Sequence, residues 1–266
     1  IGKLDDRYIS VSELEAHSEL DVVGLIPRLK ASEMQILQEN DKRHILVESF
    51  RNIRSSILFM PEGSYNPKSF LISSAIPGEG KSTLAMDLAV TMALSGSKTL
   101  LVDGDLRRGR LNRHFAAKTE PGIAEVLKDK AALDDSIVET PVPNLSFLPR
   151  GKCMAAGTEP LPGPKFSKII NTLHDKFDYV IIDSCPVLAA DDSSAMAPLV
   201  DAVFFVVRAR FTSARLFIRS LKLLAVRGVM VRGLIYNCAE MGSSDYPYYQ
   251  YKEYHRAATA PETLKT

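Results

Sequence analysis

Short apolar runs alternate with helical patterns through the middle of the chain. These runs are apolar without a break rather than at every second position, which is typical of strands covered on both faces of a sheet. The predicted strands are residues 70–73, 99–102, 145–148, 180–182, 203–207 and 231–236, and the predicted helices are residues 83–95, 165–176, 193–199 and 213–227. Alternation of this kind predicts a doubly wound α/β fold with a mainly parallel sheet.

The segments on either side of this core have a different character. A helical pattern over residues 33–58 precedes the core, and a polar tail follows it. Residues 151–164 are rich in glycine and proline, which predicts an exposed loop. We therefore expect an N-terminal extension of residues 1–65, a core of residues 66–241 and a flexible tail of residues 242–266.

The most specific motif follows the first predicted strand, where residues 74–83 read SAIPGEGKST. Gly78 and Gly80 allow the backbone to pass close to a polyphosphate with its N–H groups directed inward, and Lys81 brings a positive charge to the phosphate oxygens. The strict phosphate-loop pattern has glycine where Ala75 stands, and the alternative is an ordinary glycine-containing turn. The candidate nucleotide-binding residues are Gly78, Glu79, Gly80, Lys81, Ser82 and Thr83.

Aspartates end two further predicted strands. The segment KTLLVDGDLRR places Asp103 and Asp105 after one apolar run, and YVIIDSCP places Asp183 after another. Because the carboxyl ends of parallel strands meet at one edge of a sheet, we expect these carboxylates beside the phosphate loop, where Mg²⁺ and a nucleophile would lie. Three motifs in this order favour a phosphate-handling site over a structural coincidence.

Composition narrows the class of protein. The chain is 45% hydrophobic and 24% charged, which is typical of one large globular domain, and its net charge of +1 does not favour nucleic-acid binding. Cys153, Cys185 and Cys238 are widely spaced, so neither a disulfide framework nor a CxxC site is indicated, and a reducing compartment is favoured. No apolar run approaches the roughly 20 residues of a membrane span. Because the sequence begins at Ile1 and not at methionine, we expect a piece of a longer protein with a membrane segment upstream.

Tyrosines are concentrated in the tail. Five of the nine lie in the segment SDYPYYQYKEY, namely Tyr246, Tyr248, Tyr249, Tyr251 and Tyr254. One interpretation is a docking surface, although Pro247 and the polar flanks disfavour an edge strand. The functional interpretation is that the hydroxyls accept phosphate, each gaining about −1.5 to −2 charges.

Together these motifs resemble the bacterial tyrosine kinases, or BY-kinases, which control the export of capsular polysaccharide and exopolysaccharide. The resemblance rests on AIPGEGKST, LLVDGDLRR, VIIDSCP, the tyrosine cluster and ESFRNIRS at residues 48–55. In that family a segment of the form ExxRxxR mediates ring-like self-association, in which one subunit's tail enters a neighbour's active site. Glu48, Arg51 and Arg54 match this form position by position. From spacing alone, the alternative is an exposed Glu–Arg pair within one helix.

The resemblance implies a P-loop fold of the deviant-loop type that binds ATP and Mg²⁺ and phosphorylates its own tail tyrosines in trans. Lys81 would hold the phosphates, and Ser82, Asp103 and Asp183 would hold the metal. Asp103 is the candidate for accepting or orienting the tyrosine proton, and Asp105 for tuning the metal or the base. The assignment between these two aspartates stays open.

Other polar residues each have two interpretations. Asn237 lies where relatives place an adenine contact, but a strand-end asparagine is equally a turn residue. Arg208, at the end of another strand, is similarly ambiguous. Arg107 or Arg108 would contact transferred charge or an incoming phosphotyrosine, or would be solvated.

The resemblance also implies partners and a location. The N-terminal residues resemble the segment that follows the last membrane helix in the family, which implies the cytoplasmic face of the bacterial inner membrane. A membrane-spanning activator domain, fused upstream or on a separate chain, and a cognate tyrosine phosphatase are the expected partners, and nucleic acid is not. Phosphorylated tyrosines would repel one another, so we expect phosphorylation to loosen the ring.

Three other functions compete with this interpretation. A partitioning or cell-division ATPase of the same loop class carries an additional lysine where Ile76 stands. An iron–sulfur scaffold needs paired cysteines, which this sequence lacks. The third is a non-catalytic nucleotide-binding regulator whose tail only docks.

Overall fold

The computed structural model describes residues 5–30, 33, 35–59, 67–152 and 163–240, and all structural statements below refer to these residues. Its strands are β1 (Val22–Pro27), β2 (Ser69–Ser74), β3 (Thr99–Asp103), β4 (Val138–Glu139), β5 (Leu145–Leu148), β6 (Tyr179–Asp183), β7 (Ala202–Arg208) and β8 (Val231–Ala239). They form one eight-stranded sheet in the order β1-β8-β7-β2-β6-β3-β5-β4. Only the β4–β5 pair is antiparallel among these strands, so the sheet is mainly parallel, as predicted.

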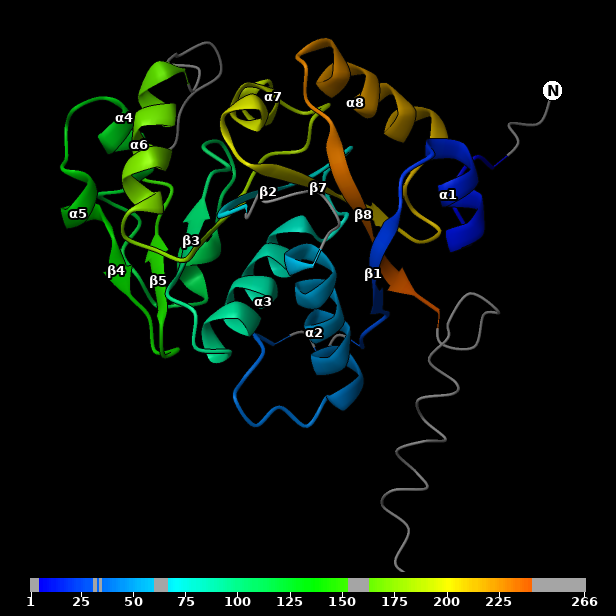
Figure 1. Ribbon diagram of the computed structural model, residues 1–266, viewed down its shortest axis with the longest axis horizontal. Coiled ribbons are helices and arrows are strands. Elements are labelled where there is room, and N and C mark those ends of the chain that lie inside the picture. The colour runs from blue at the N-terminus through cyan, green and yellow to red at the C-terminus, as the bar shows by residue number, and fades with distance from the viewer. Residues whose placement is uncertain (1–4, 31–32, 34, 60–66, 153–162, 241–266) are drawn as a thin grey trace, which may run out of the picture.

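Helices cover both faces of the sheet. They are α1 (Val11–Ser18), α2 (His44–Leu58), α3 (Lys81–Leu94), α4 (Ile123–Leu127), α5 (Leu133–Ser136), α6 (Pro164–His174), α7 (Asp192–Met196) and α8 (Ala214–Val226), with short 3-10 turns η2 (Leu111–Arg113) and η3 (Ala197–Leu199). Figure 1 shows α2 and α3 on one side of the sheet and α6, α7 and α8 on the other. This is the predicted doubly wound architecture. No helix of the described part of the chain is long and apolar enough to cross a membrane.

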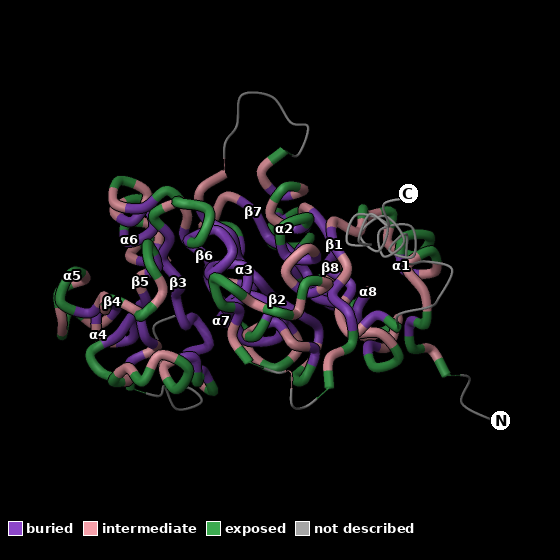
Figure 2. The backbone as a smooth tube through the Cα atoms, turned by 90° about the horizontal axis from the view of Figure 1, so that it is seen from below, coloured by how far each residue is buried: buried purple, intermediate pink, exposed green. Residues whose placement is uncertain are grey.

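Strand β7 shows why the apolar runs are continuous. Phe204 packs into the core between the sheet and α2 and α3, whereas its neighbour Phe205 packs into the core on the opposite face. Both side chains are at most 1% exposed, and each contributes roughly 1.5–3 kcal/mol by burial. Figure 2 shows the buried strands running through the middle of the molecule beneath exposed helices and loops.

Strand β1 was not predicted, because VVGLIP contains Gly24 and Pro27 and both residues disfavour a strand interior. It forms an edge of the sheet beside β8. A Cβ on Gly24 would lie 2.0 Å from Cγ1 of Ile53, so the glycine allows α2 to pack closely on this strand. The short antiparallel strand β4 was also missed. The N-terminal extension therefore contributes a strand to the sheet of the core.

The helical pattern at residues 33–58 forms a helix only in its second half. Helix α2 begins at His44, and the prediction of helix was wrong for residues 35–43. Arg43 donates hydrogen bonds to the carbonyls of Gln35 at 2.9 Å and Ile36 at 3.2 Å, and the N–H of Leu37 donates to Asp87 at 3.1 Å. These tertiary contacts bind backbone groups that a helix would use itself, and so they override local propensity.

The first described residues lie against the turn that joins β7 to α8. The N–H of Tyr8 donates to the carbonyl of Thr212 at 3.2 Å, and the N–H of Arg210 donates to the carbonyl of Tyr8 at 2.8 Å. Asp6 accepts a hydrogen bond from the hydroxyl of Ser213 at 2.6 Å. The ring of Tyr8 is fully buried, which fixes this segment in place.

Candidate active site

The phosphate loop connects β2 to α3 at the carboxyl edge of the sheet. Gly78 and Gly80 have φ values of 91° and 95°, in the left-handed region that glycine adopts at little cost. A Cβ on Gly80 would lie 2.1 Å from Nδ2 of Asn237, so space also excludes a side chain there. Helix α3 begins at Lys81 with no side-chain cap, which leaves its first N–H groups available for an anion.

Lys81 lies at the centre of a charged cluster. Its Nζ is 3.3 Å from Oδ1 of Asp183 and 3.7 Å from Oδ2 of Asp105, and it donates to the hydroxyl of Ser82 at 3.1 Å. Burial on its own lowers the pKa of Lys81, but the charges of Asp183 and Asp105 act against burial, and the pKa lies above its ordinary value. The ammonium therefore stays charged at neutral pH.

Asp103 and Asp183 are direct neighbours at the ends of β3 and β6. Burial raises the pKa of Asp103 to about 7, with a further contribution from the charge of Asp183. Burial also raises the pKa of Asp183, although Lys81 acts against it. Two like charges held this close and away from water favour the binding of a cation or a proton.

The residues present fit a magnesium ion. Oδ1 of Asp103 and Oδ2 of Asp183 are buried without a hydrogen-bond partner in the described part of the chain, which is costly unless another group supplies the contact. No group of three or more His, Cys, Asp or Glu side chains that could hold a metal occurs among the described residues. Mg²⁺ needs only one or two carboxylates when substrate phosphates complete its shell. Carboxylate oxygens of this pair and the Ser82 hydroxyl are oxygen ligands of the kind that Mg²⁺ prefers.

A turn covers Asp103. A Cβ on Gly109 would lie 2.0 Å from Oδ1 of Asp103, and the N–H of Leu111 donates to Oδ2 at 3.1 Å. Asp103 is consequently only 1% exposed. This cover could not be predicted from the sequence, because the distance between Gly109 and Asp103 depends on the path of the chain after the strand.

Asp105 faces an open cavity of about 590 Å³. Its Oδ1 accepts the N–H groups of Arg107 at 3.3 Å and Arg108 at 2.9 Å, which shapes the turn after β3. Arg107 donates from Nε to Asp192 at 2.6 Å, so its guanidinium is held by a side chain from α7. Both arginines line the cavity together with Lys81 and Ser82, next to the phosphate loop.

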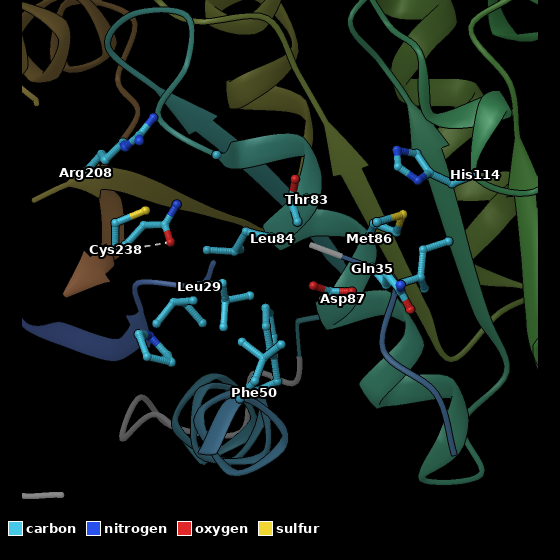
Figure 3. Close-up of a pocket in the computed structure, with 16 residues that line it drawn as sticks. Leu29, Gln35, Phe50, Thr83, Leu84, Met86, Asp87, His114, Arg208 and Cys238 are labelled. Atoms are coloured by element: carbon cyan, nitrogen blue, oxygen red, sulfur yellow. Dashed lines mark hydrogen bonds between the residues drawn. The ribbon is translucent and has the colours of Figure 1, made fainter. Parts of the chain in front are cut away.

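A second, smaller pocket of about 160 Å³ adjoins Gly80 and Thr83. Its wall is mainly apolar, and Figure 3 shows Leu29 and Phe50 opposite Leu84 of α3. Further apolar lining comes from Ile26, Pro27, Ile36, Leu46 and Met86. Sequence reasoning missed this pocket, because residues from the extension looked like ordinary core residues. The only useful signal was the cluster of apolar residues around Pro27.

The side chain of Glu79 is turned into the protein. It is fully buried and accepts hydrogen bonds from the N–H of Ile76 at 2.8 Å and from the hydroxyl of Thr212. Burial raises its pKa. Asn237 donates to the carbonyl of Glu79 at 2.8 Å, and Arg208 donates to the carbonyl of Gly78 at 2.7 Å. These contacts tie the loop to the ends of β7 and β8.

The other predicted residues lie elsewhere. Arg51 pairs with Glu48 at 2.7 Å along the exposed side of α2, and Arg54 donates to the carbonyl of Thr91 in α3 at 3.3 Å. These contacts match the intrahelical alternative for the first pair, and they leave the predicted interface untested. The five tail tyrosines and most of the glycine- and proline-rich loop lie outside the described residues.

The phosphate loop joins β2 to α3, and a lysine, Lys81, stands at the start of that helix. The neighbouring strands β3 and β6 both end in aspartate at the same edge of the sheet. This arrangement defines a P-loop nucleotide-binding protein of the doubly wound class. In agreement, a family model described as an AAA domain matches residues 69–215.

Comparison with known proteins narrows the class. The chain is 31% identical to the tyrosine-protein kinase ptk of Acinetobacter johnsonii, over 88% of this chain but 33% of that protein. It is 38% identical to the tyrosine-protein kinase CpsD of Streptococcus agalactiae, over 61% of this chain and 70% of that protein. The solved BceF tyrosine kinase domain superposes with a TM-score of 0.78 at 31% identity, covering 87% of this chain and 99% of that domain. The chain belongs to the bacterial tyrosine kinase family, and it spans about a third of the length of the Acinetobacter relative.

Proposed function

We propose that the protein transfers the γ-phosphoryl group of ATP to tyrosine hydroxyls. The observation that carries this proposal is the meeting of Lys81, Asp105 and Asp183 at the start of α3, beside an open cavity. The names of the relatives as tyrosine-protein kinases support tyrosine as the acceptor.

In this proposal the phosphates lie on the loop. The backbone N–H groups of residues 78–82 and the ammonium of Lys81 bind the phosphate oxygens, and most of the rate enhancement comes from positioning and charge neutralisation. The nucleoside extends into the apolar pocket beside Gly80 and Thr83, next to Asn237. Asp183, Asp103 and Ser82 hold Mg²⁺, directly or through water, and bound Mg²⁺ would neutralise charge on the phosphate oxygens.

The transfer needs no reactant other than ATP and the tyrosine hydroxyl. The tyrosine oxygen bonds to the γ-phosphorus, the bond from that phosphorus to the bridging oxygen breaks, and ADP leaves. The tyrosine proton passes to a carboxylate, for which we propose Asp103, which lies beside Asp183 at the end of β3 and keeps one oxygen without a partner among the described residues. Because Gly109 covers Asp103, the turn after Asp105 has to withdraw before a tyrosine reaches it. Asp105 already faces the cavity and is the alternative acceptor.

The acceptors we propose are Tyr246, Tyr248, Tyr249, Tyr251 and Tyr254 of a second copy. The tail follows β8, whose end lies at the same edge of the sheet as the phosphate loop. Glu48, Arg51 and Arg54 would form the contact between copies in a ring. By the family resemblance, a membrane-spanning activator and a tyrosine phosphatase act on the kinase, and the pathway is export of capsular polysaccharide or exopolysaccharide at the inner membrane.

The test is to incubate the purified chain with MgATP and to map phosphotyrosine by mass spectrometry, beside Lys81→Met and the matched surface variant Lys168→Met. We expect label in the tail of the parent and of Lys168→Met only, since Lys168 is exposed on α6. ATP hydrolysis without tyrosine label would instead indicate a partitioning-type ATPase. Nucleotide binding without either reaction would indicate a non-catalytic regulator.

A mixing experiment tests transfer in trans. Lys81→Met protein serves as the acceptor, and a parent chain truncated before residue 242 serves as the enzyme. Label on the Lys81→Met tail is the expected result. Label that appears only when active site and tail belong to the same molecule contradicts transfer between copies.

A further inference from the structure

Two carbonyl groups of the phosphate loop are held from outside the loop. Nη1 of Arg208 donates to the carbonyl of Gly78 at 2.7 Å, and Nδ2 of Asn237 donates to the carbonyl of Glu79 at 2.8 Å. Arg208 and Asn237 are direct partners in the register of β7 and β8. The two donors therefore stand side by side at the carboxyl edge of the sheet and bind consecutive peptide groups.

The planarity of the peptide bond links these contacts to the other side of the loop. In a trans peptide the C=O and the following N–H point in opposite directions. A carbonyl of Gly78 held toward Arg208 directs the N–H of Glu79 away from Arg208, and a carbonyl of Glu79 held toward Asn237 directs the N–H of Gly80 away from Asn237. Neither N–H donates to another group in the described part of the chain, and Gly78 and Gly80 line the open cavity.

These two peptide groups need hydrogen bonds from outside the loop to fix their orientation, because glycines flank them. Gly78 and Gly80 both have positive φ, and glycine populates several backbone regions at similar free energy. A peptide between two such residues rotates easily, and its rotation would turn an N–H away from the cavity. Each constraint is itself fixed: the guanidinium of Arg208 lies 5.0 Å from the ring centre of Phe211, and Oδ1 of Asn237 accepts the N–H of Cys238 at 2.8 Å.

We propose that Arg208 and Asn237 are positioning residues that orient the N–H groups of Glu79 and Gly80 toward the phosphates. This inference rests on the proposed function, because it assumes that a nucleotide binds on this loop. It assigns to Asn237 an action on the phosphates through the backbone, whereas a contact with the base would act on the nucleoside alone.

The two roles are separated by a ligand that has phosphates and no base. We would measure binding of MgATP and of inorganic tripolyphosphate with Mg²⁺ by calorimetry, for the parent, Arg208→Met and Asn237→Asp. Asn237→Asp keeps the side-chain shape and removes the donor, and Asn237→Leu removes the donor without adding a negative charge, so a loss shared by both variants reports the lost hydrogen bond. We expect each variant to weaken both ligands by the same factor, roughly tenfold, as expected when a hydrogen-bonded polar group loses its partner. Arg208→Lys, which keeps a donor and the charge, should recover part of the affinity.

The controls remove equivalent groups without touching the loop. The side chain of Arg210 pairs with Glu240 at the surface of the same turn, so Arg210→Met removes a nearby positive charge. Asn171 is exposed on α6, so Asn171→Asp adds the same negative charge at a distance. Both should bind tripolyphosphate and ATP as the parent does, and thermal unfolding of every variant verifies folding. If Asn237→Asp does not fold, Asn237→Ser replaces it.

Loss of ATP binding with unchanged tripolyphosphate binding would overturn the inference in favour of a base contact. Unchanged binding of both ligands would overturn it as well, with the proposed function intact. If the parent binds neither ligand, the proposed function is wrong and so is this inference.

Discussion

Asp103 and Asp87 are two buried aspartates whose pKa values are both raised to about 7, in surroundings of opposite character. Burial is the main cause for both. Asp103 lies beside the like charge of Asp183, and its Oδ1 has no partner among the described residues. Asp87 lies on α3, where the N–H of Leu37 donates to it at 3.1 Å and the charge of Arg43 lowers its pKa.

A raised pKa therefore does not by itself identify a residue that takes part in the reaction. Asp87 fastens the segment before α2 to α3 and has a partner for its charge nearby. Asp103 belongs to a pair of carboxylates with unsatisfied oxygens, so a cation or a proton is needed to complete its surroundings. Only the second arrangement predicts a role in phosphoryl transfer.

The largest expected effect is on catalysis. Asp103→Asn should lower the initial rate of tail phosphorylation by about 100-fold or more, because general-base catalysis typically contributes 10²–10⁴-fold. The loss of rate in Asp87→Asn should be at least tenfold smaller. Initial rates come from quantitative mass spectrometry of the tail peptides, with Asp105→Asn beside them. Equal losses in Asp103→Asn and Asp87→Asn would show that the two aspartates do not differ in their role, and a larger loss in Asp105→Asn would indicate that Asp105 is the proton acceptor.

The next effect is on stability as a function of pH. The pKa of Asp87 in the folded state, about 7, lies above the ordinary value of 3.8 for an aspartate. The unfolded chain therefore holds fewer protons at this group between these values, and its contribution to stability falls as pH rises through this window. Asp87→Asn should stabilise the protein at pH 8 by up to a few kcal/mol, and much less at pH 4.5. Denaturant unfolding at both pH values measures this, and a gain that does not depend on pH would contradict it.

A smaller effect concerns the cover over Asp103. Gly109→Ala would place a Cβ 2.0 Å from Oδ1 of Asp103, so the turn has to move, at a cost of about 1–3 kcal/mol. Ala117→Gly removes one methyl group from a half-buried residue after η2 and serves as the control. Denaturant midpoints measure the cost. An unchanged midpoint for Gly109→Ala would mean that the turn over Asp103 moves with no measurable loss of stability.

The smallest effect is a difference between the two variants in the Mg²⁺-dependent part of a ligand-induced shift. MgADP at about 100 times its dissociation constant should stabilise the parent by about 2.7 kcal/mol, a rise of a few degrees in Tm. Asp103→Asn should lose much of the part of this rise that depends on Mg²⁺, whereas Asp87→Asn should keep it. Thermal scans with ADP, with and without Mg²⁺, make the measurement. Loss of the Mg²⁺-dependent part in both variants would mean that the two carboxylates do not differ in this respect.

Much of the fold could be predicted from the sequence, because the apolar runs from Phe70 to Tyr236 are continuous and the helices between them are regular. The phosphate loop and the strand-end aspartates could also be predicted, since short-range chemistry dictates their spacing. Strand β1 could not, because Gly24 is there for the close approach of Ile53, a residue distant in sequence. Two further features depend likewise on tertiary distances that no local pattern encodes. One is the turn at Gly109 that covers Asp103, and the other is the pair of hydrogen bonds from Arg208 and Asn237 to the loop.

The hydrogen bonds between Tyr8 and the β7–α8 turn have a mechanical consequence. That turn carries Thr212, which binds Glu79, and it follows Arg208, which binds Gly78, so a pull on the chain before Asp6 reaches the phosphate loop through two successive layers of contacts. Hydrogen exchange at the Ile76 amide, which donates to the Glu79 side chain at 2.8 Å, should then accelerate in a chain lacking residues 1–9, because contacts of the first described residues would no longer support the phosphate loop.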